Sequence, residues 1–67
     1  MKIIVLHDRY DNEPVIVRPD AISMIRQEND EGKKYSNIVV EGIATDIKET
    51  IGAVMVKIKR AESEVEK

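Results

Sequence analysis

The chain has to build its core from aliphatic side chains, because Tyr10 and Tyr35 are its only aromatic residues and it has no cysteine. Without cysteine it can form neither a disulfide nor a thiolate metal site. A chain this short buries only roughly 60% of its unfolded surface. The sequence therefore predicts one small domain over residues 1–67 with a thin core. Small domains of this kind gain burial by associating with a second copy or with another protein.

The charges of the chain are nearly balanced and spread along its length. With 11 basic and 13 acidic residues, the formal net charge is −2. A charge of this size creates no field that gathers nucleic acid or anionic lipid. The apolar run from Ile3 to Leu6 is far shorter than the roughly 20 residues of a membrane span. We therefore expect a cytoplasmic protein that does not bind a membrane, and we disfavour general binding of nucleic acid.

Two strands are predicted near the N-terminus, at residues 2–7 and 14–18. The first is apolar at Ile3 and Val5 as well as at Ile4 and Leu6, a pattern typical of a central strand covered on both faces. Turn-forming residues separate the two runs, so we expect a hairpin. Pro14 places the second strand near a sheet edge.

The segment from Ala21 to Arg26 fits two structures. Ile22 and Met24 alternate as in a strand, whereas Ile22 and Ile25 also suit one helical turn with Asp20 as its cap. We favour a strand over residues 21–26. The polar residues 27–34 that follow are expected to form a solvated loop.

The C-terminal half predicts a second hairpin and a helix. Strands are expected at residues 35–41 and 43–48, with Gly42 in the turn between them, and a helix at residues 50–64 with Thr50 as its N-cap. The fold class is therefore α+β. We expect a small antiparallel sheet or partial barrel of four to five short strands, followed by a C-terminal amphipathic helix.

The helix carries an apolar stripe at heptad spacing, which also includes Ile47 before the helix and Val65 after its predicted end. The stripe permits two interpretations. Its first turns can pack on the domain's own sheet through Ile51, Val54, Met55 and Ile58, while the distal end either frays or meets a partner helix. If the stripe is an interaction surface, the residues predicted to form the interface are Ile51, Val54, Ile58 and Ala61.

The sequence offers no constellation typical of an enzyme, and we predict no catalytic, cofactor-binding or metal-binding residue. His7 is the single histidine, and a lone histidine more often makes a local hydrogen bond than it binds metal or transfers protons. The acidic loop residues lack calcium-loop spacing, and no serine has a base in a recognisable motif. We expect a non-enzymatic protein without a cofactor or small-molecule substrate.

The main alternative is a small nucleic-acid-binding module. It would use a local basic patch composed of Lys33, Lys34, Lys57, Lys59 and Arg60. Three acidic residues follow the helical part of this patch and can pair with it at helical spacing, which favours a solvated and self-neutralised face. These residues are Glu62, Glu64 and Glu66.

One arrangement resembles a known family. It consists of Val17-Arg18-Pro19-Asp20-Ala21-Ile22-Ser23-Met24-Ile25, a hairpin, and Ile47-Lys48-Glu49-Thr50-Ile51 opening a helix that continues from Val54 to Ile58. This arrangement resembles the small FlbD-type flagellar proteins over most of the chain, and it also looks like uncharacterised small proteins of bacteria and phages. The chain has a Glu41-Gly42 turn where Asn-Gly is usual in that family. The resemblance implies a cytoplasmic, non-catalytic accessory protein, and it carries over no functional residue.

Taken together, these features predict a small accessory protein that acts through protein–protein interaction or self-association.

Overall fold

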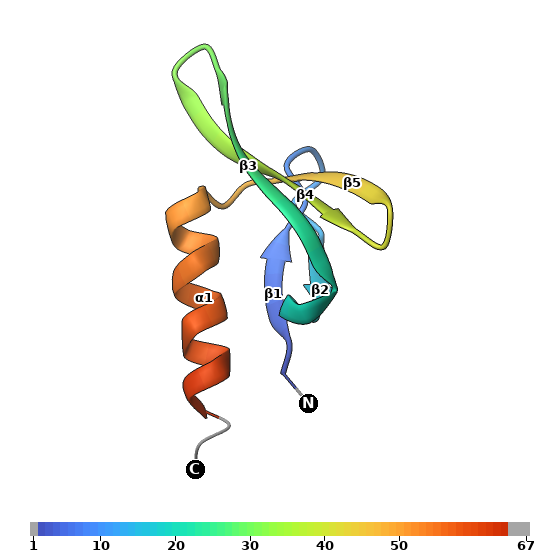
Figure 1. Ribbon diagram of the computed structural model, residues 1–67. Coiled ribbons are helices and arrows are strands. Elements are labelled where there is room, and N and C mark those ends of the chain that lie inside the picture. Colours follow the sequence, from blue (N-terminus) through green and yellow to red (C-terminus); the bar gives the residue numbers. More distant parts are fainter. Residues whose placement is uncertain (1, 65–67) are drawn as a thin grey trace.

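The computed structural model describes residues 2–64 and contains five strands, one turn of 3-10 helix and one α-helix, as Figure 1 shows. The strands form two antiparallel sheets, with the order β1-β2 in one and β3-β4-β5 in the other. The helix α1 follows all five strands and lies alongside β1. The α+β class predicted from the sequence is confirmed.

The first sheet is a hairpin of β1 (Ile4–His7) and β2 (Pro14–Val17), as predicted. Its inner face is apolar and buried, with Leu6 fully enclosed. Its outer face is not covered, because Val5 is 38% exposed and its cross-strand partner Ile16 is 64% exposed. The prediction that the first strand is covered on both faces is therefore wrong. One face of β1 is uncovered because the strand belongs to a two-stranded sheet, and only the inner face of that sheet packs on the core.

The second sheet consists of β3 (Ile22–Asp30), β4 (Lys33–Val40) and β5 (Ile43–Ile47). The ambiguous segment is a strand from Ile22 onward, preceded by a 3-10 turn over Pro19–Ala21. The predicted solvated loop over residues 27–34 is wrong, because β3 and β4 continue to a two-residue turn at Glu31 and Gly32. Both turn residues have positive φ, of 51° and 87°, as a type I′ hairpin turn requires. Glu41 and Gly42 repeat this geometry between β4 and β5.

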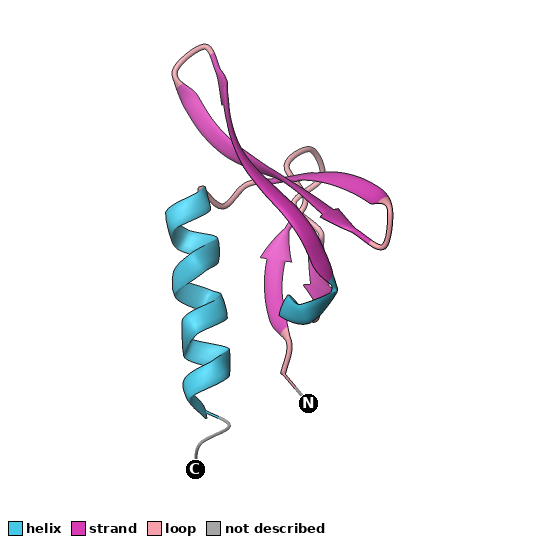
Figure 2. Cartoon of the chain, in the orientation of Figure 1, coloured by secondary structure: helices cyan, strands magenta, loops and turns pink. Residues whose placement is uncertain are grey.

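The core lies where the inner faces of the two sheets meet the helix. The two sheets join at one end, where Asp8 forms a bridge with Ile47 and the Arg9 N–H donates to the Asp46 carbonyl over 3.0 Å. Figure 2 shows the β3–β4 hairpin extending past the N-terminal end of the helix. The buried apolar residues are Ile4, Leu6, Val17, Ile38, Ile47 and Val54.

The helix α1 (Ile51–Glu64) begins where the sequence predicts. The Ala53 N–H donates to the Thr50 hydroxyl over 3.3 Å, which confirms Thr50 as the capping residue. A second cap comes from the sheet, because the Ile51 N–H donates to the Gln27 side-chain carbonyl over 3.1 Å. The two bonds satisfy amides that the helix itself leaves without partners.

No helix in residues 2–64 is long and apolar enough to span a membrane.

Burial predicts that replacing two isoleucines of the same sheet with alanine lowers the free energy of unfolding by very different amounts. Ile38 in β4 is fully buried, whereas Ile43 in β5 is 69% exposed. Ile38→Ala should lower the free energy of unfolding by about 2–5 kcal/mol, because it leaves a cavity in the core. Ile43→Ala, as the matched control, should cost less than about 1 kcal/mol. Urea denaturation followed by circular dichroism measures both changes, and equal costs would contradict this placement of the core.

Candidate functional site

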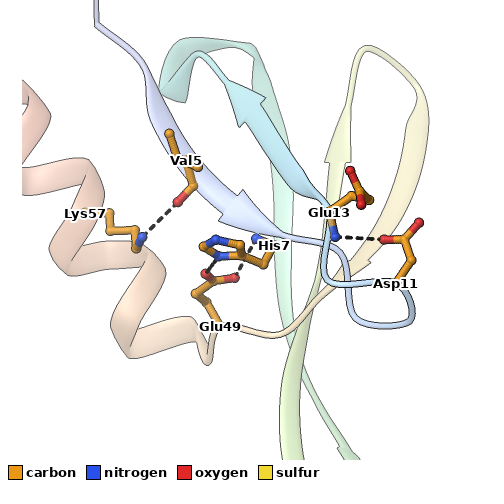
Figure 3. A network of polar contacts seen from close by, with 6 residues as sticks. All are labelled: Val5, His7, Asp11, Glu13, Glu49 and Lys57. Atoms are coloured by element: carbon orange, nitrogen blue, oxygen red, sulfur yellow. Dashed lines mark hydrogen bonds and ion pairs between the residues drawn. The ribbon is translucent and has the colours of Figure 1, made fainter.

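The outer edge of β1 is closed by polar contacts from the segment that leads into the helix and from the helix itself (Figure 3). The His7 N–H donates to Glu49 Oε1 over 3.0 Å, and the His7 ring Nδ1 lies 2.7 Å from Glu49 Oε2. The Lys48 N–H donates to the His7 carbonyl over 2.8 Å, and Lys57 Nζ donates to the Val5 carbonyl over 2.8 Å. His7 therefore does form a hydrogen bond within the protein, but its partner Glu49 lies 42 residues away in the sequence, so the bond is not the local one that was expected.

The Glu49 carboxyl is held in its ionised form by these contacts. Burial acts to raise its pKa, but the hydrogen bonds from the His7 ring and the His7 amide outweigh burial, so that the pKa lies below its ordinary value of 4.5. Only 14% of the Glu49 side chain is exposed. The pair therefore has the geometry of a structural clamp that fixes β1 to the start of the helix.

Ser36 carries a hydroxyl, which is a group that enzymes use as a nucleophile. Its side chain is completely enclosed in the core. Its Oγ has no hydrogen-bond partner within residues 2–64. A hydroxyl in this position has neither a base to activate it nor an opening to solvent, and burying it unpaired lowers stability. The same part of the chain contains no group of three His, Cys, Asp or Glu residues able to hold a metal ion.

The predicted helix stripe lies toward the chain's own core. Val54 is fully buried, Ile58 and Ala61 pack against the buried cluster, and Ile51 is half-buried. Met55, which was expected to pack on the sheet with them, is 45% exposed, and this part of the prediction is wrong. It lies about 100° around the helix from Val54, outside the packed stripe. Val65 lies outside the described residues. As an interface, the stripe stays a prediction.

The outer face of the first hairpin exposes a group of neighbouring aliphatic side chains, and we call it the hairpin face. It consists of Ile3, Val5 and Ile16, which are 46%, 38% and 64% exposed. Val5 and Ile16 lie directly opposite each other in the register, so their side chains share one face of the sheet. The double apolar pattern of β1 is the sequence signal for this face, because it predicts apolar side chains on both faces of the strand, of which the structure buries only one.

A second surface combines basic and aromatic side chains around a hollow of about 470 Å³. It forms where the loop after β1 meets the β3–β4 hairpin and the end of β5. We call it the basic hollow. Its lining residues are Arg9, Tyr10, Lys33, Lys34, Tyr35 and Lys48.

The structure divides the basic patch that the sequence suggested. Lys33 and Lys34 line the basic hollow. Lys57 instead donates to the backbone of β1, and Lys59 and Arg60 are exposed on the helix. Arg9, Tyr10 and Lys48 were missing from the sequence prediction, because the pairing of distant strands is what brings them to the hollow.

Comparisons with known protein families, curated proteins and solved structures gave no match to this chain.

The Glu49 clamp predicts a stability that depends on acidic pH. Because the folded pKa of Glu49 is depressed, its contribution is present above the ordinary pKa of 4.5 and is lost as the pH falls through the folded pKa. Glu49→Gln should remove this part of the pH dependence. At neutral pH it should also cost roughly 1.5–3 kcal/mol, the usual range for hydrogen bonds to a charged group. Urea denaturation between neutral and acidic pH measures both effects. An unchanged pH profile in Glu49→Gln would show that the clamp contributes nothing.

Proposed function

We propose that this protein is a non-enzymatic accessory protein that acts by self-association, and that two copies meet through the hairpin face. The observation that carries the proposal is the exposed apolar pair Val5 and Ile16, together with Ile3 beside them. Isolated surface aliphatics are common, whereas adjacent exposed aliphatics on one sheet face are typical of interaction sites.

The shape of the core supports a second copy as the partner. The first sheet has only two strands, and two-stranded sheets are marginal unless further burial supports them. Its inner face already packs on a small core, so the outer face is the remaining surface through which it gains burial. A twofold dimer would place each hairpin face against its equivalent, so that the apolar side chains of the two copies bury one another.

The free edges of the hairpin support the same surface. The outer edge of β1 is occupied by Lys48, Glu49 and Lys57, and this blocks the addition of another strand there. β2 is the terminal strand on the other side of the sheet. With the edge of β1 blocked, the outer face is the apolar surface of the hairpin that stays open to a second copy, and Ile16 of β2 lies on it opposite Val5.

The cellular setting is part of the proposal. The absence of cysteine fits a reducing compartment, which supports a cytoplasmic protein. The resemblance to FlbD-type proteins supports an accessory role in a bacterium or phage.

The test compares two aspartate substitutions at exposed isoleucines. Ile16→Asp puts a charge into the hairpin face, and Ile43→Asp puts the same charge at a position of similar exposure in β5. Size exclusion with light scattering across a dilution series should show a dimer for the wild type. Ile16→Asp should weaken the dimer at least about tenfold, as expected for a central interface residue. Ile43→Asp should leave the dimer unchanged.

A third variant separates this surface from the helix stripe. Ile58→Asp should unfold the protein, as circular dichroism would show, because Ile58 packs against the core. A folded Ile58→Asp that dissociates would move the interface to the helix. A wild type that is monomeric at every concentration would overturn self-association.

A further inference from the structure

The basic hollow suggests an activity separate from self-association. It lies on the loop after β1, the β3–β4 hairpin and the residue after β5, and it includes no residue of the hairpin face. Among residues 2–64, no acidic residue lines the hollow itself, although Asp30 and Asp46 accept hydrogen bonds from the lining residues Arg9 and Tyr10. This composition, of cations beside aromatic rings, is the one that proteins use to hold single strands of nucleic acid.

Arg9 organises one wall of the hollow. Its guanidinium carbon lies 3.9 Å from the centre of the Tyr35 ring, and Arg9 Nη2 donates to Asp30 over 2.7 Å. The Arg9 side chain is only 20% exposed, and the stack on Tyr35 and the ion pair with Asp30 hold it in place. Asp30 neutralises the charge of Arg9, so Arg9 acts in this wall as a support for the tyrosines rather than as a free cation.

Tyr10 provides an exposed aromatic surface. Tyr10 is 73% exposed, and its hydroxyl donates to the Asp46 carboxylate over 2.9 Å. Asp46 also accepts a hydrogen bond of 2.8 Å from the Asn37 side chain, which fixes the acceptor. An aromatic ring that is tethered at its hydroxyl and open to solvent loses little further freedom when a flat group stacks on it.

The cations of the hollow are Lys33, Lys34 and Lys48. All three are exposed, and none forms a salt bridge within the described part of the chain. Their charges are therefore available to an anionic ligand. The global charge of −2 is small, so the attraction acts locally at the hollow.

We propose that the basic hollow binds single-stranded nucleic acid, with a base stacked on Tyr10 and backbone phosphates beside Lys33, Lys34 and Lys48. The exposed ring favours this ligand over an acidic protein, which would use the lysines without the ring. It also favours a single strand over a duplex, whose bases are already stacked on each other and expose no face to Tyr10.

The first measurement is the fluorescence anisotropy of a labelled single-stranded oligonucleotide titrated with the full chain. Binding should weaken with salt, with a slope of log K against log salt near −2 for about three phosphate contacts. An unlabelled single strand should compete, whereas a duplex of the same sequence, inorganic polyphosphate and an acidic peptide should compete at least about tenfold less well.

Two charge-reversal variants test the position of the site. Lys33→Glu/Lys34→Glu reverses two charges in the hollow, and Lys59→Glu/Arg60→Glu makes the same change in net charge on the exposed face of the helix. The first should weaken binding at least about tenfold and reduce the salt slope. The second should change binding no more than about twofold to threefold.

Two substitutions of Tyr10 test the stack. Tyr10→Ala should weaken binding about tenfold, within the range found for single stacked bases. Tyr10→Phe retains the ring and should bind within about threefold of the wild type. Circular dichroism checks that each variant is folded.

Several results would overturn the proposal. The proposal is wrong if the oligonucleotide does not bind at low salt, or if the two charge-reversal variants lose the same amount of binding affinity. It is also wrong if wild type and Tyr10→Ala bind the oligonucleotide equally well. Competition by polyphosphate or by the acidic peptide as strong as that by the single strand would show that the hollow recognises charge alone.

Discussion

The junction at His7 is the constraint on which the rest of the structure depends. The His7 amide and ring both contact the Glu49 carboxylate, and the His7 carbonyl accepts from the Lys48 amide. This one residue therefore joins the first hairpin to the end of β5 and to the start of the helix. Because the core contains few buried side chains, its geometry relies on such polar contacts at its border more than that of a larger domain does.

The same junction determines which surfaces are left to function. By closing the outer edge of β1, it leaves the hairpin with an apolar outer face and one open edge at β2. By holding β1 against β5, it also directs the following loop over the second sheet, where Arg9 meets Tyr35 and Asp30. The two proposed activities thus use different residues, because no residue of the hairpin face lines the basic hollow.

Much of the fold could be predicted from the sequence, because short β-branched runs and a capped amphipathic segment indicate strands and a helix directly. The β3–β4 turn was missed because the residues on both sides of Glu31-Gly32 are polar and show no apolar alternation, whereas Glu41-Gly42, which has the same positive φ, lies between apolar strand segments. The candidate sites were harder to predict. Arg9 and Asp30 are 21 residues apart, and no local pattern shows that strand pairing brings them together.

Amide hydrogen exchange followed by NMR tests the central role of the junction most directly. If His7 and Lys48 hold the two sheets and the helix together, their amide protons should exchange only through global unfolding, at the same free energy as core amides such as those of Leu6 and Ile38. The Glu49→Gln variant should lower the protection of all four amides together. Rapid exchange at His7 and Lys48 beside well-protected core amides would contradict the account, because the junction would then open while the fold stays intact.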